Sequence, residues 1–88
     1  MKNTDEIREW LDELRGERRS LVTKQMVLGN AGAMNALTWV LDTSPDADAV
    51  RLKVNELQVK RNETMADEMA SVGYGAMIEA LSWVLRDN

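Results

Sequence analysis

The chain has 88 residues, so one small domain is expected, and it contains neither cysteine nor histidine. These absences exclude disulfides, thiolate nucleophiles, the commonest zinc ligands and the commonest general base. The net charge of −4 disfavours duplex nucleic acid as a partner, because proteins that bind it usually present a basic face. One proline, no phenylalanine and many strong helix formers predict an all-α fold.

The N-terminal stretch MKNTDEIREW is acidic and amphipathic, which is unlike a signal peptide. No apolar run reaches the roughly 18–20 residues of a membrane span. We therefore expect a cytoplasmic protein.

The first predicted helix begins with Thr4 as its N-cap, followed by acidic residues that suit the helix dipole. Its apolar stripe recurs at helical spacing through Ile7, Leu11, Leu14, Leu21 and Leu28. Gly29-Asn30 is a sequence that ends helices. A second, short helix is predicted over residues 31–42.

The segment 42–46 (DTSPD) holds the only proline and is the clearest break in the chain. Ser44 is the expected N-cap of the next helix, with Pro45 at its first position. That helix carries the stripe Val50, Val54, Leu57, Met65, Met69 and Val72. Gly73-Tyr74-Gly75 is the second predicted joint, and a last helix runs to about Arg86.

The glycines also allow a different interpretation. Gly29, Gly32, Gly73 and Gly75 can lie inside continuous helices as kinks or points of close contact, at a cost of roughly 1 kcal/mol each relative to alanine.

One phrase occurs twice: GAMNALTWVL at 32–41 and GAMIEALSWVL at 75–85. The two copies of the phrase, together with ELxxxR at Glu13 and Glu56, align when the chain is shifted by 43 or 44 residues. We interpret this as an internal duplication with repeats 1–44 and 45–88 in a single helical domain. The prediction is a pseudo-symmetric antiparallel helical hairpin or small bundle.

Both short helices are apolar on nearly every side, because Trp39 lies opposite Leu37 on the helical wheel and Trp83 lies opposite Leu81. Such helices must be covered all round. We therefore expect them to pack together and against a second chain, as a homodimer or larger oligomer. In the alternative interpretation, the two tryptophans are exposed anchors for a different protein.

Arg18 and Arg61 fall on the apolar stripes at matching places. One hypothesis is a structural ion pair with Glu13, Glu17, Glu56 or Glu63 that fixes helix register. The other is a clamp in which both arginines hold a phosphate or carboxylate.

A basic cluster and an acidic stretch complete the candidate residues. Arg15, Arg18, Arg19 and Lys24 form the cluster, and Asp67, Glu68, Glu79 and Asp87 form the stretch. The acidic stretch either neutralises the basic cluster within a dimer or faces a basic partner. A solvated surface is the preferred interpretation of both features.

The phrase GxxxALxWVL after a charged amphipathic helix resembles small helical proteins encoded by phages and prophages. That resemblance covers about ten residues in each copy and implies an accessory protein of a mobile element. It brings no catalytic residues, metal ligands or cofactor, and we expect no enzyme activity.

Three functions are considered. The first is an interaction protein that occludes a host, defence or virion protein through Trp39, Trp83, Tyr74, Asp67 and Glu68. The second is a sponge for an anionic small molecule such as a nucleotide, using Arg18 and Arg61 with Arg15 and Arg19 nearby. The third is a nucleic-acid binder through the basic cluster, which the net charge disfavours.

Overall fold

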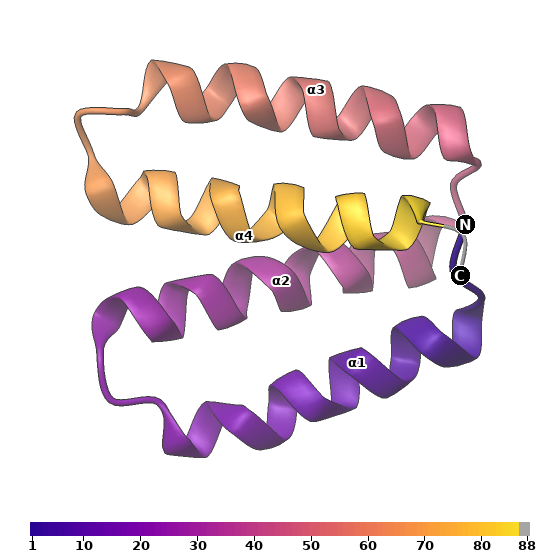
Figure 1. Cartoon of the computed structure of the whole chain (residues 1–88), viewed down its shortest axis with the longest axis horizontal. Coiled ribbons are helices and arrows are strands. Elements are labelled where there is room, and N and C mark those ends of the chain that lie inside the picture. Colours follow the sequence, from indigo (N-terminus) through magenta and orange to yellow (C-terminus); the bar gives the residue numbers. More distant parts are fainter. Residues whose placement is uncertain (87–88) are drawn as a thin grey trace.

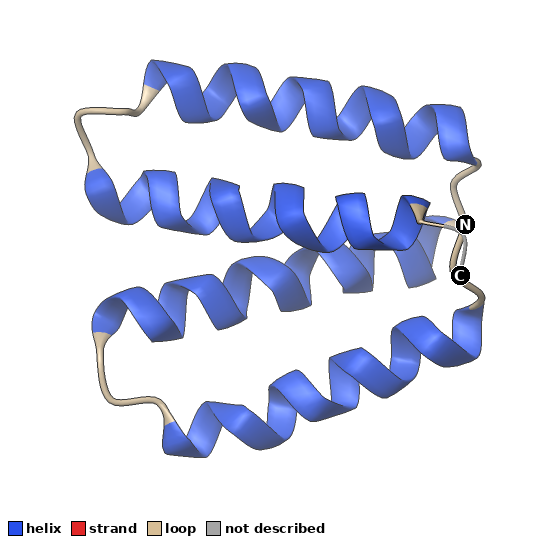
Figure 2. Cartoon of the chain, in the orientation of Figure 1, coloured by secondary structure: helices blue, strands red, loops and turns tan. Residues whose placement is uncertain are grey.

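The computed structural model describes residues 1–86 and contains four α-helices (Figure 2). They are α1 (Thr4–Glu17), α2 (Lys24–Thr43), α3 (Ala47–Glu63) and α4 (Glu68–Leu85), with a short 3₁₀ turn, η1 (Arg18–Ser20), after α1. Residues 1–86 include no β-strand. The predicted all-α helical bundle is confirmed, with a radius of gyration of 12.8 Å.

The chain folds as two antiparallel hairpins, α1–α2 and α3–α4 (Figure 1). α2 and α4 occupy the middle of the bundle and make its most extensive helix–helix contact, while α1 and α3 lie on the outside. The connections within the two hairpins lie at the same end of the molecule, which we call the loop end, and both termini lie at the other end (Figure 1). The expected packing of the two apolar segments against each other is thus observed in α2 and α4.

The core contains one apolar stripe from each helix. Ile7, Leu11 and Leu14 of α1 are buried, as are Val50 and Leu57 of α3. α2 and α4 contribute Ala33, Ala36, Leu37 and Val40, and Ala80, Leu81 and Val84. The stripes predicted for residues 7–14 and 50–57 therefore point inward, but Met65 and Met69, predicted to continue the second stripe, are exposed.

The predicted helix ends at Gly29-Asn30 and Gly73-Tyr74-Gly75 are wrong. The chain breaks earlier, after η1 and after Glu63, and both glycine segments lie inside continuous helices. Thr23 caps α2 by accepting a hydrogen bond from the Met26 N–H at 3.1 Å, and Asp67 caps α4 in the same manner. These caps begin new helices inside the two segments that the apolar spacing predicts as single long helices.

Gly32 shows why a glycine belongs in the middle of α2. A Cβ atom on Gly32 would lie 2.6 Å from the Gly73 carbonyl oxygen and 3.2 Å from the Cβ of Ala76. Real Cβ atoms do not approach that closely, so the two central helices cross at a distance that only glycine permits. The interpretation of the glycines as points of close contact is confirmed at this position.

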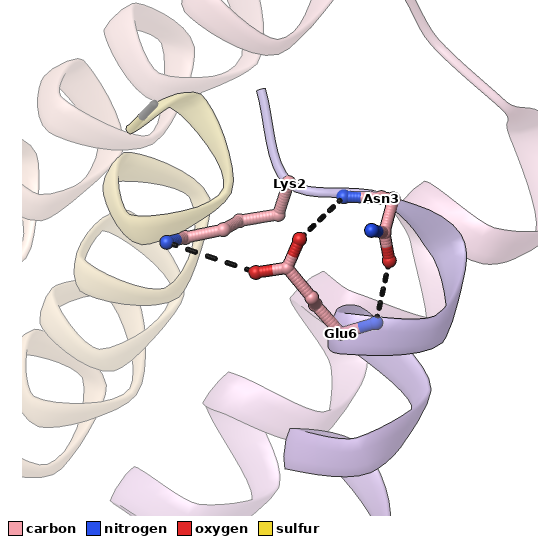
Figure 3. Close-up of polar contacts among 3 residues, drawn as sticks. All are labelled: Lys2, Asn3 and Glu6. Atoms are coloured by element: carbon pink, nitrogen blue, oxygen red, sulfur yellow. Dashed lines mark hydrogen bonds and ion pairs between the residues drawn. The ribbon is translucent and has the colours of Figure 1, made fainter. Parts of the chain in front are cut away.

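Two further predicted caps are wrong. α1 is capped by Asn3 and not Thr4: the Asn3 side chain accepts from the Glu6 N–H at 2.8 Å, and the Glu6 carboxylate accepts from the Asn3 N–H at 3.4 Å (Figure 3). α3 is capped by Asp46, which accepts from the Ala49 N–H at 2.8 Å. Ser44, the expected cap, instead ends α2 with a left-handed backbone at φ 48°. The last helix ends at Leu85, one residue before the predicted end.

Candidate functional site

A groove opens between α2 and α3, with α4 at its base, and encloses about 270 Å³. We call it the α2–α3 groove. It exists because α3 packs closely on α4 but approaches α2 much less closely. Its walls are mainly apolar, and its lining residues are Asn35, Ala36, Trp39, Lys53, Leu57, Lys60, Tyr74, Met77 and Leu81.

The groove combines half-buried aromatic rings with cationic side chains. Trp39 comes from α2 and Tyr74 from α4, and both are partly buried. Lys53 and Lys60 lie seven residues apart on α3, which places them two turns or about 10 Å apart along the helix. The Lys53 ammonium lies 5.7 Å from the centroid of the Trp39 ring. This is a site with an apolar floor and two positive charges on one wall.

Glu56 lies between these lysines on the same helix. Its carboxylate is 3.7 Å from Lys53 Nζ and 3.8 Å from Lys60 Nζ. The three side chains are between 33% and 54% exposed, so these ion pairs are screened by solvent and contribute little to stability. Glu56 therefore holds the two lysines only weakly in place.

A second hollow, of about 310 Å³, lies between α1 and α4 and is acidic. It is lined by Glu6, Glu9, Trp10, Glu13 and Trp83. The rings of Trp10 and Trp83 meet edge to face with their centroids 4.7 Å apart. The Lys2 ammonium lies 5.1 Å from the Trp83 ring centroid and 4.0 Å from the Glu6 carboxylate, and the Lys2 side chain points from the N-terminal segment toward α4 (Figure 3).

The two hollows differ at one matching position. Trp10 and Lys53 lie 43 residues apart, and each contacts the tryptophan of a central helix. Trp10 covers Trp83 with a second large ring, whereas Lys53 covers Trp39 with a slender chain. The acidic hollow is therefore lined by two tryptophan rings and glutamates, while the α2–α3 groove is lined by one tryptophan, one tyrosine and two lysines.

The structure brings together only part of the predicted protein-binding set. Trp39 and Tyr74 line the same groove, but Trp83 lies in the separate acidic hollow. Asp67 accepts hydrogen bonds from the Met69 and Ala70 N–H groups as the cap of α4, and Glu68 is exposed beside it.

Arg18 and Arg61 do not share a pocket in the described part of the chain. Arg18 ends α1 and Arg61 lies in the last turn of α3, so the two arginines are on the outer helices (Figure 1). Both are exposed, and within residues 1–86 neither forms the expected ion pair with a glutamate. Arg61 instead lies against Gly75 and donates a long hydrogen bond, 3.4 Å, from Nε to Ser71 Oγ.

The other basic residues lie at the loop end. Arg15 pairs with Asp12 at 3.2 Å on the surface of α1. Arg19 and Lys24 are exposed in η1 and in the first turn of α2. The acidic Glu79 is exposed on α4, and Asp87 lies outside the described residues.

The sequence alone did not identify Lys53 and Lys60 as site residues. The available pattern was two lysines seven residues apart on one helix, on the side that also carries Leu57. The lysine pair forms a candidate site only together with Trp39 and Tyr74. Both of these residues are distant from the lysines in the sequence, so the spacing of the lysines alone did not indicate a site.

Residues 1–86 contain no cluster of three potential metal-binding side chains. No helix in this part of the chain combines the length and apolar character needed to cross a bilayer. Comparisons of the chain with protein-family models, curated proteins and solved structures find no match.

Proposed function

We propose that this protein is a non-enzymatic interaction module that binds a segment of another protein in the α2–α3 groove. The observation that carries the proposal is the convergence of Trp39 and Tyr74, from two different helices, beside Lys53 and Lys60. Aromatic side chains in a partly desolvated depression are typical of binding hot spots.

The charges of the groove define the partner segment. An apolar side chain would lie over Leu57 and Met77, and a carboxylate would reach Lys53 or Lys60. The positive wall disfavours a basic segment, since like charges brought together in an interface cost several kcal/mol. The partner is therefore an acidic segment with an apolar anchor.

The proposed mode of action is occlusion of a surface on the partner protein. As proposed here, the bundle acts by covering the surface that it binds. The resemblance of the repeated phrase to small phage-encoded helical proteins supports an accessory or inhibitory role in the cytoplasm of a host cell, against a host, defence or virion protein.

We also propose that the chain arose by internal duplication. Leu14 and Leu57, which lie 43 residues apart, are both buried, as are Leu37 and Leu81, which lie 44 apart. Each pair occupies corresponding helices of the two hairpins (Figure 1). The duplication supports an ancestral dimer of hairpins.

Site-specific photo-crosslinking in cells that make the protein tests the proposed site. A photoreactive residue replaces Lys60 at the groove, and a matched control replaces Arg51, which is exposed on the same helix. Protein adducts from position 60 that are absent from position 51 are expected. If position 60 yields no protein adduct, or the same adducts as position 51, the groove is not the binding site.

A second candidate function is the uptake of an anionic small molecule. It is favoured by the two lysines beside aromatic rings, which replace the separated arginines Arg18 and Arg61 as the candidate anion ligands. Native mass spectrometry of protein purified without refolding tests it. A retained mass of a few hundred daltons that is lost in Lys53→Met/Lys60→Met would support the sponge over the protein-binding module.

A further inference from the structure

Both hairpin connections expose apolar side chains at the loop end. Val22 is 85% exposed and Met26 45% exposed at the α1–α2 connection, and Met65 is 71% exposed and Met69 38% exposed at the α3–α4 connection. These residues match in pairs, because Met65 follows Val22 by 43 residues and Met69 follows Met26 by 43. One end of a small bundle thus presents four exposed apolar side chains, a pattern typical of interaction surfaces.

The two connections carry opposite charges. Residues 18–26, the basic tip, contain three cationic side chains and no carboxylate: Arg18, Arg19 and Lys24. Residues 61–69, the acidic tip, contain three carboxylates and one cationic side chain: Glu63, Asp67, Glu68 and Arg61. Lys24 and Asp67 occupy matching places with opposite charge.

Most of these charged side chains have no ion-pair partner within residues 1–86. Among residues 1–86, none of the three cationic residues of the basic tip forms an ion pair, and Glu63 and Glu68 also form none. The two tips lie on the two hairpins at the same end of the molecule (Figure 1). Each molecule thus carries one apolar basic tip and one apolar acidic tip at two corners of the same end (Figure 1).

We propose that a second copy of this chain docks on the loop end through a twofold axis. A rotation about an axis perpendicular to the view of Figure 1 places the basic tip of each copy against the acidic tip of the other. A twofold contact made in this way uses the same surface on both copies and closes at two subunits. The exposed Val22 and Met65 then meet across the interface, as do Met26 and Met69.

The two tips share no residue with the lining of the α2–α3 groove. The two proposals therefore stand independently. The complementary charges set the relative orientation of the copies, because the other end-to-end arrangement would bring tips of like charge together.

Charge reversal tests the interface. Arg19→Glu/Lys24→Glu makes both tips acidic, and Glu63→Lys/Glu68→Lys makes both basic, while Asp67 is retained because it caps α4. The wild-type protein is expected to be dimeric by sedimentation and native mass spectrometry. Each reversed variant alone should dimerise at least tenfold more weakly, and an equimolar mixture of the two should form a one-to-one heterodimer.

Controls separate this result from misfolding and from other interfaces. Circular dichroism must show that each variant retains its helix content. Arg8→Glu, an exposed change on α1 away from the loop end, should leave the dimer intact. Raising the salt concentration should weaken the wild-type dimer, since screening acts on exposed charge pairs.

Three outcomes would overturn the proposal. The wild-type protein could remain monomeric up to about 1 mM, the concentration at which even weak association becomes visible. The reversed variants could dimerise as well as the wild type. The mixture of folded variants could fail to form a heterodimer.

Discussion

Gly32 of α2 lies so close to Gly73 of α4 that a Cβ on Gly32 would stand 2.6 Å from the Gly73 carbonyl oxygen. This contact fixes how closely the two central helices cross.

Gly32→Ala should destabilise the protein by about 1–3 kcal/mol, because overpacking at the crossing outweighs the gain in helix propensity. Gly16→Ala is the matched control: Gly16 is exposed in α1, and a Cβ added there would meet no packing neighbour within 4 Å. It should stabilise the protein by up to about 1 kcal/mol. Urea unfolding measures both, and equal effects of the same sign would contradict the close crossing.

Lys53→Trp should place an indole ring in the α2–α3 groove and obstruct access to it. Position 53 corresponds to Trp10, whose ring packs edge to face on Trp83. A tryptophan there can pack on Trp39 in the same way, with stability unchanged or raised by up to about 1 kcal/mol. The photo-crosslinks from position 60 should disappear, whereas Arg51→Trp on the exposed side of α3 should keep them. If a folded Lys53→Trp protein crosslinks as efficiently as the protein with Lys53, the α2–α3 groove is not the binding site.

Asn30→Asp should make stability depend on pH. Asn30 is buried, and its Nδ2 donates to the Leu14 carbonyl oxygen at 2.7 Å. A carboxylate has no proton to donate and loses its hydration, so the variant should be less stable by about 2–4 kcal/mol at neutral pH.

Burial raises the pKa of the introduced carboxyl above its unfolded value, so the folded protein favours the protonated form. Stability should therefore recover as the pH falls through the raised folded pKa, and the gain should end near the unfolded value of about 3.9. Urea titrations at several pH values measure this. Asn55→Asp, exposed on α3, is the control and should show no such recovery.

Arg18→Met and Arg61→Met should each change stability by less than about 0.5 kcal/mol, since both side chains are exposed and neither has an ion-pair partner within residues 1–86. The Arg61 guanidinium lies beside Gly75 and makes only a long hydrogen bond, 3.4 Å, to Ser71, so little is lost with it. Thermal unfolding and native mass spectrometry test the pair. If the wild-type protein retains an anion and either variant loses it, the hypothesis that Arg18 and Arg61 bind an anion would be supported.

The sequence by itself determined the helical class and the core stripes. Helix-forming composition and apolar spacing identified Ile7, Leu11, Leu14, Val50 and Leu57 as inward residues, and all five are buried. The break at residues 42–46 was also predictable, because proline acts through local backbone geometry. These features depend on neighbours in the chain, which the sequence displays directly.

Only the tertiary structure decided where the other helices end and which polar residues meet. Gly29-Asn30 had the local character of a helix end, but packing against α4 continues α2 through it, so the benefit of burial exceeds the local cost of glycine. The α2–α3 groove likewise depends on three helices from both halves of the chain. Lys53 becomes part of the candidate site because it lies close to Trp39. Helix packing, and not spacing along the sequence, brings these two residues together.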